Sequence, residues 1–142
     1  MSIFVVATST VTLAGAEAVI AAARAEAVSR GVAVTIAVLD RGGHIVAQAR
    51  MDGIHVATVP VSIAKARTAV HYNRPTSALA TSFAGGNAAL ATLPDLVPLP
   101  GGIPLIAPSG LAGAVGVSGA APDVDDAIAN AGAAAFVQGV AT

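Results

Sequence analysis

Alanine-rich sequence with scattered polar residues, from Thr12 to Arg30, predicts the first helix of the chain. Threonine commonly caps the start of a helix, and the glycine that follows at position 31 is a residue type that commonly ends one. The pattern changes at residues 32–40, VAVTIAVLD, where β-branched and apolar residues follow one another without alternation. Such a run is typical of a central strand that is covered on both faces.

Residues 40–43 have the composition of a turn. Apolar and polar side chains alternate after it, which predicts that residues 44–52 form a strand paired with the first one. Successive side chains of an extended strand point to opposite faces of the sheet. One face would carry Ile45, Ala47, Ala49 and Met51, and the other would carry His44, Val46, Gln48 and Arg50.

Further along the chain, the pattern predicts two helices, a long loop, a second hairpin and a last helix. Pro60 is tolerable in the first turn of the first of these helices, and Pro75 separates that helix from the next. Three aspartates, Asp123, Asp125 and Asp126, would complement the N-terminal dipole of the last helix. The predicted segments are helices at 59–73 and 76–83, an ordered loop rich in Gly and Pro at 85–102, strands at 103–107 and 111–119, and a helix at 122–136.

The order of these elements predicts an α+β fold with a central antiparallel sheet of four to five strands flanked by helices. Four strands come from the two hairpins, and residues 3–7 are the candidate for a fifth. A chain of 142 residues is one domain by length. We therefore expect an N-terminal extension at residues 1–11 and a single domain at residues 12–142.

Composition excludes several classes of function. The net charge is −1, so no basic field attracts nucleic acid or an anionic membrane surface. The absence of cysteine excludes disulfides, thiolate metal sites and cysteine nucleophiles. We identify neither a signal peptide nor a membrane span, and the expected location is the cytoplasm.

The high hydropathy of the chain points to self-association. Mean hydropathy is +0.78, and 55% of the residues are hydrophobic, which is more than one small core accommodates. Exposed apolar surface of this extent normally marks an interface. We expect a homo-oligomer in which residues 111–119 and the flanking helices are buried between subunits.

Basic residues gather between positions 50 and 74, where four of the seven lysines and arginines of the chain lie. Arg67, Thr68 and His71 would share one stripe of the predicted helix, with Lys65 and Tyr72 nearby. The plain interpretation is a solvated helix face. The functional interpretation is a site for a ligand that carries carboxylates.

Two other patterns leave their alternatives open. The spacing of His44, His55 and His71 does not predict a metal site held by several histidines, although a single imidazole suffices as an axial ligand of haem iron. Gly113, Gly116 and Gly119 permit the close approach of another backbone, within the chain or across a subunit contact, or of a ligand. No motif for a serine nucleophile is present around Ser118.

The motifs RMDG, KARTA, RPT and GVSG occur in this order, and the chain resembles the GlcG/HbpS family over residues 12 to 136. This family is also called the haem-degrading family or DUF336, and the chain is also similar to the C-terminal domain of PduO-type cobalamin adenosyltransferases. The resemblance implies a profilin-like layer fold, symmetric oligomers and, in characterised relatives, haem binding. Ile54-His55 stands where the family often has a small residue after RMDG, and His71-Tyr72-Asn73 stands where it often has an aromatic or small residue before RPT.

The leading hypothesis is a haem- or tetrapyrrole-binding protein with a pocket built from residues 50–74. Its axial candidates are His55 and His71, and its ligand-binding candidates are Arg50, Met51, Lys65, Arg67, Thr68, Tyr72 and Arg74. The alternative is a cofactor-free biosynthetic enzyme, an isomerase, lyase or cyclase, acting on a small carboxylate- or enolate-bearing substrate. In that case His55 or His71 would move a proton and Asp52 would orient it.

Overall fold

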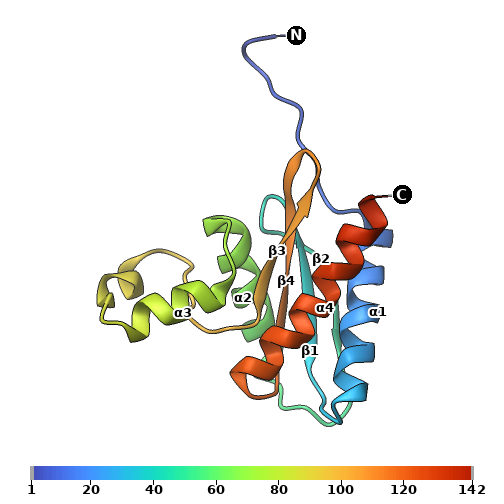
Figure 1. Ribbon diagram of the computed structural model, residues 1–142, viewed down its shortest axis with the longest axis vertical. Helices are drawn as coiled ribbons and strands as arrows, with labels where there is room; N and C mark the ends of the chain where they lie inside the picture. Colours follow the sequence, from blue (N-terminus) through green and yellow to red (C-terminus); the bar gives the residue numbers. More distant parts are fainter. Residues whose placement is uncertain (1, 142) are drawn as a thin grey trace.

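A computed structural model describes residues 2–141, in which four strands form one antiparallel sheet in the order β2-β1-β4-β3. The predicted α+β class with two hairpins is confirmed. The strands are β1 (Thr35–Asp40), β2 (Ile45–Arg50), β3 (Gly102–Ala107) and β4 (Gly110–Ser118). The helices are α1 (Leu13–Ser29), α2 (Thr58–Tyr72), α3 (Thr76–Ala84) and α4 (Pro122–Val140), with a 3₁₀ helix at Ala88–Thr92 (Figure 1).

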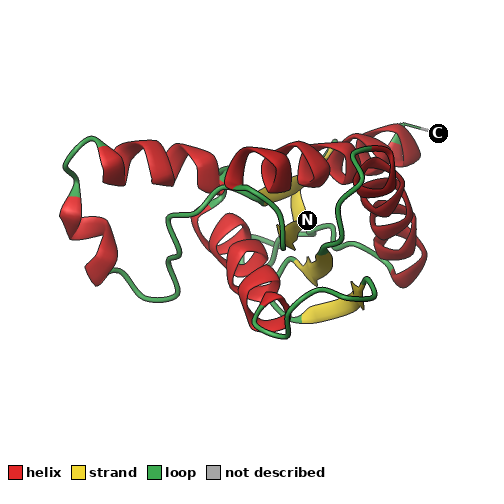
Figure 2. Cartoon of the chain, turned by 90° about the horizontal axis from the view of Figure 1, so that it is seen from below, coloured by secondary structure: helices red, strands yellow, loops and turns green. Residues whose placement is uncertain are grey.

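Helices cover both faces of the sheet, so the strands between them are apolar on both sides (Figure 2). On one face, α1 and α4 lie side by side over a core that includes Ile36, Val38, Val115 and Val117. On the other face, α2 packs against a smaller cluster that includes Leu39 and Ala114. This arrangement explains the unbroken apolar run of β1, all of whose residues up to Leu39 are buried.

Local signals place the ends of α1 where the sequence predicts them. The Thr12 hydroxyl accepts a hydrogen bond from the Gly15 N–H at 3.0 Å, which satisfies a helix donor that would otherwise lack a partner. Gly31 follows the helix with a φ of +69°, a conformation that favours glycine. The last helix, α4, continues to Val140, four residues beyond the predicted end at Phe136.

The fifth strand predicted at residues 3–7 is wrong. Residues 5–10 form no regular element, and the chain runs away from the molecule beyond the tip of the β3–β4 hairpin (Figure 1). The segment has a high β propensity but forms no strand, because no edge of the sheet lies beside it to pair with. The predicted loop at 85–102 also contains a short helix, Ala88–Thr92.

Glycines of β4 are explained by packing within the chain. A Cβ added at Gly116 would lie 2.6 Å from the Ala66 backbone nitrogen and would overlap the Ser62 carbonyl oxygen, both in α2. Glycine therefore lets α2 approach the sheet closely. The expectation that residues 111–119 are buried between subunits is wrong, since residues 112–118 are already covered inside the chain.

Candidate functional site

The predicted site residues fall into two groups at opposite ends of α2. Arg50, Asp52 and His55 lie at the end of β2 and in the loop that enters the helix, whereas His71 lies in its last turn. Positions 58 and 71 of a helix are about 20 Å apart. The prediction of one pocket across residues 50–74, with His55 near His71, is therefore wrong, because a rigid helix holds the two histidines apart.

The first group borders an open cavity at the end of β2. This cavity has a volume of about 400 Å³ and is lined by Arg24, Ala49, Arg50, Met51 and Asp52. Arg24 comes from α1, and its contribution to a site is not visible in the local sequence pattern. Two guanidinium groups, a thioether side chain and one carboxylate therefore border the same space.

Two residues near the end of β2 make hydrogen bonds with neighbouring parts of the chain. The Met51 sulfur accepts a hydrogen bond from the Val34 N–H at 3.4 Å, which places this side chain beside the residue that precedes β1. The His55 carbonyl accepts a hydrogen bond from the Thr58 hydroxyl at 2.7 Å, while the residue itself is exposed. His55 therefore has a backbone fixed at the start of α2 and a side chain facing solvent.

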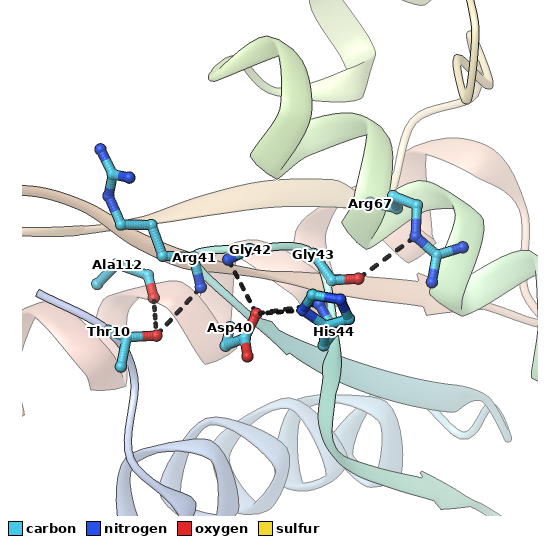
Figure 3. Close-up of polar contacts among 8 residues, drawn as sticks. All are labelled: Thr10, Asp40, Arg41, Gly42, Gly43, His44, Arg67 and Ala112. Atoms are coloured by element: carbon cyan, nitrogen blue, oxygen red, sulfur yellow. Dashed lines mark hydrogen bonds and ion pairs between the residues drawn. The ribbon is translucent and has the colours of Figure 1, made fainter.

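The second group lies beside the β1–β2 turn, at the other end of the same strands. Arg67 donates from its Nε to the Gly43 carbonyl at 3.3 Å, and its terminal nitrogens point away from the turn (Figure 3). A Cβ added at Gly43 would lie 2.7 Å from the His71 Nε2, and the φ of Gly43 is +84°. Both facts indicate that this position favours glycine for reasons of backbone conformation and space.

Asp40 organises the turn in the same view. Its Oδ1 accepts hydrogen bonds from the N–H groups of Gly42 and His44 at 2.9 and 3.0 Å (Figure 3). The His44 Nδ1 lies 3.6 Å from the same oxygen, and the His44 side chain is 83% exposed. This is the pattern of an Asx-type turn.

Thr68 and Tyr72 anchor the loop that follows α3 onto α2. The buried Thr68 hydroxyl accepts a hydrogen bond from the Val97 N–H at 3.0 Å, and its single proton has two acceptors in range, the Ala64 carbonyl at 2.8 Å and the Asp95 carbonyl at 3.0 Å. The Tyr72 hydroxyl donates to the Pro94 carbonyl. The His71 Nδ1 lies 4.0 Å from the Asp95 carboxylate. Thr68 and Tyr72, both predicted ligand contacts, thus have partners inside the chain.

A small cavity lies under this anchored loop. It has a volume of about 220 Å³ and is lined by Ala64, Arg67, Leu93, Asp95, Leu96 and Val97. Arg74 follows α2, is exposed, and does not line this cavity.

Lys65 is buried inside the protein and is paired with a residue that lies 60 positions away. Its ammonium donates to the Asp125 carboxylate at 3.0 Å and to the Val117 carbonyl at 2.9 Å. Burial raises the pKa of the Asp125 carboxyl above its ordinary 3.8, while the Ala120 N–H and the Lys65 charge act in the opposite direction. The pair joins α2 to α4 across the end of β4.

Asp126, next to that pair, is a half-buried carboxylate. Burial raises its pKa above 3.8, and the Gly101 N–H and the charge of Lys65 oppose that rise. Its Oδ1 has no hydrogen-bond partner among the described residues. The sequence pattern assigned Asp125 and Asp126 to the helix dipole and did not reveal the contact of Asp125 with Lys65, because no local pattern reports a contact across 60 positions.

The described residues contain no cluster of three or more His, Cys, Asp or Glu side chains that could hold a metal ion. An axial ligand to haem iron needs only one such group. None of the described helices is long and apolar enough to cross a membrane.

A family model described as "Haem degrading protein HbpS-like" matches residues 11–134. The protein GlcG of Escherichia coli K12 is 41% identical over 103 residues, which cover 72% of this chain and 77% of GlcG. Crystal structures give the same result for the fold. A double mutant of Streptomyces reticuli HbpS superposes with a TM-score of 0.85 at 34% identity, over 94% of this chain and 92% of that chain.

A heme complex of PduOC superposes with a TM-score of 0.80 over 89% of this chain and 94% of that chain. The two sequences are 24% identical, so this likeness shows that the two proteins share a fold and nothing more. The family match covers nearly the whole chain, and the GlcG and HbpS relatives agree with it. The chain therefore belongs to the HbpS-like family, which the order of its sequence motifs predicted.

Proposed function

We propose that this protein binds haem or a related tetrapyrrole at the cavity formed by the end of β2 and α1. The observation that carries this proposal is the set of groups around that cavity: Arg24, Arg50 and Met51, with His55 in the adjoining loop. The description of the family as haem degrading supports the ligand class. The heme complex of a protein with the same fold supports it further.

The chemistry of these groups suits a tetrapyrrole. Such a ligand requires apolar contact with its ring, cations for its propionates and one axial group. Ala49 and Met51 would contact the ring, and Arg24 and Arg50 would pair with the propionates. His55 is the axial candidate, because its imidazole is exposed beside this end of the sheet.

Size and chemistry argue against two further cavities as the haem site. Small-molecule sites commonly have volumes of about 300–1,000 Å³. The cavity beside Arg67 measures about 220 Å³, below that range. The groove near the N-terminal segment measures about 670 Å³, but its lining contains no His, Met, Cys or Tyr to act as an axial ligand.

The geometry removes one form of the enzymatic alternative, the form in which His55 and His71 act together. An acid–base pair made of His55 and His71 requires both side chains at one substrate, and α2 separates them. His71 has Asp95 and Arg67 as neighbours at its own end, whereas Asp52 lies at the other. A joint catalytic role for the two histidines therefore has no support in the geometry.

Hemin titration tests the proposal, with the appearance of a Soret band as its readout. We expect a saturable band for the wild type, a shifted or weakened band for His55→Ala, and a wild-type band for the matched control His71→Ala. Replacing both Arg24 and Arg50 by Gln should weaken binding while leaving the position of the Soret band unchanged. A wild type that gives no spectral change at micromolar hemin contradicts the proposal.

A further inference from the structure

The N-terminal segment, residues 2–8, is an uncharged apolar arm that projects from the molecule (Figure 1). Four large side chains in it are exposed: Ile3 by 92%, Phe4 by 88%, Val5 by 69% and Val6 by 79%. The family match begins at residue 11, so the arm lies before the matched residues. Four consecutive apolar side chains in water are unfavourable, and their burial against another surface is favourable.

A groove without charged residues lies at the base of this arm. It has a volume of about 670 Å³ and lies between the chain before α1, the start of α1, the end of α4 and the tip of the β3–β4 hairpin (Figure 1). Its lining residues are Ser9, Thr10, Val11, Thr12, Ala14, Gly15, Ala18, Ala107, Pro108, Ser109, Ala112, Ala135, Phe136, Gly139 and Val140. Arm and groove match in polarity, because neither carries a charge.

The arm cannot easily fill the groove of its own chain, because its base forms one wall of that groove. The Val11 N–H donates to the Ala112 carbonyl at 2.9 Å, and the Ser9 and Ser109 hydroxyls are in contact. These contacts hold the base beside the hairpin. A return of the arm would need a sharp turn within residues 6–8, Val-Ala-Thr, which contain no Gly, Pro, Asn or Asp, the residues that favour turns most strongly.

The groove of a second copy of the chain is within reach of the arm. Seven extended residues reach about 23 Å, enough to cross from one molecule onto its neighbour. In a two-fold pair, each arm would occupy the groove of the other copy, so that both grooves and both arms are covered by one reciprocal contact. We propose that the N-terminal arm of one copy docks in the uncharged groove of a second copy.

Site-specific disulfide formation tests this exchange, because the chain has no cysteine of its own. Two single variants, Phe4→Cys on the arm and Ala18→Cys in the groove, are mixed and oxidised, and linked peptides are quantified by mass spectrometry. The matched control replaces Ala18→Cys by Val28→Cys, which is 65% exposed on the same helix about 15 Å away and outside the groove. We expect the link between positions 4 and 18 to exceed the link between positions 4 and 28 at least tenfold.

Two outcomes contradict the proposal. One is equal yield of the two links in the mixtures. The other is a link that forms only within one chain, seen in the double variant Phe4→Cys with Ala18→Cys, which identifies an arm folded onto its own groove. Phe4→Asp should also lower the mass measured by light scattering, whereas Phe4→Leu should not, and an unchanged mass for Phe4→Asp counts against the exchange. The readouts do not involve hemin.

Discussion

Lys65 and Asp125 form an ion pair in which both side chains are almost fully buried, at 4% and 3% exposure. Transfer of two charges from water is costly, and their mutual attraction and hydrogen bonds offset that cost only while both partners are present. The Lys65 ammonium also donates to Val117, and Asp125 accepts from Ala120. The pair therefore specifies how α2 and α4 meet at the end of β4.

Removing only one member of this pair should destabilise the protein strongly. Lys65→Met leaves the Asp125 carboxylate buried without its cation, and we expect the free energy of unfolding to fall by about 3–5 kcal/mol. The double variant Lys65→Met with Asp125→Leu should recover part of that loss. Urea denaturation measures both values, and a Lys65→Met variant within about 1 kcal/mol of the wild type would contradict the structural role of the pair.

Asp126 should make the stability of the protein depend on pH. Its pKa is raised above 3.8 in the folded state, so the folded protein binds this proton more tightly than the unfolded chain does. Stability from this group is therefore present at low pH and declines as pH rises from 3.8 through the raised pKa. Asp126→Asn should remove that decline, and unfolding free energies measured across this window would contradict the account if wild type and variant kept the same slope.

Thr68 should control the local order of the loop that follows α3. Thr68→Val keeps the shape of the side chain but removes the acceptor of the Val97 N–H and a donor within reach of the Asp95 carbonyl. The loss leaves polar groups without partners and should cost about 1–3 kcal/mol. Faster hydrogen exchange at Val97 than in the wild type is the expected measurement, and unchanged exchange there would show that Thr68 does not anchor this loop.

At the scale of elements, the backbone of α2 lies directly against β4, because the residue of β4 where they meet is a glycine. Gly116→Ala would bring a Cβ against the Ser62 carbonyl and the Ala66 nitrogen, which are backbone atoms that cannot move independently. We expect a loss of about 3 kcal/mol of stability. Gly139→Ala is the matched control, since a Cβ there meets nothing within 4 Å, and helix propensity predicts no loss. Equal thermal midpoints for the two variants would argue against this packing.

Helices and strands could be predicted from the sequence where neighbouring residues determine their ends. Thr12 and Gly31 bound α1, and the turn at residues 40–43 joins β1 to β2 as expected. The segment at residues 3–7 has equally strong β propensity but has no strand beside it, so propensity alone misled the prediction. Contacts between distant segments were not predictable, as Lys65 with Asp125 and Arg24 beside Arg50 illustrate.

At the scale of the molecule, α2 decides how the candidate site is arranged. His55 and His71 are close in sequence, but the helix between them places them at opposite ends of the sheet. Grouping residues 50–74 into one pocket from the sequence ignored that length. The cavity at the end of β2 then collects two arginines and a methionine near His55, and the turn end collects His71 with Arg67 and Asp95.

The most direct test of this arrangement compares hemin binding by His55→Ala and His71→Ala, two single variants in the same region of sequence. Each is first checked for folding by circular dichroism, and the Soret band is then followed during titration. We expect His55→Ala to change the band position and to weaken binding at least tenfold, and His71→Ala to match the wild type. Loss of the band in His71→Ala with a wild-type band in His55→Ala would place the site at the other end of α2 and contradict the account.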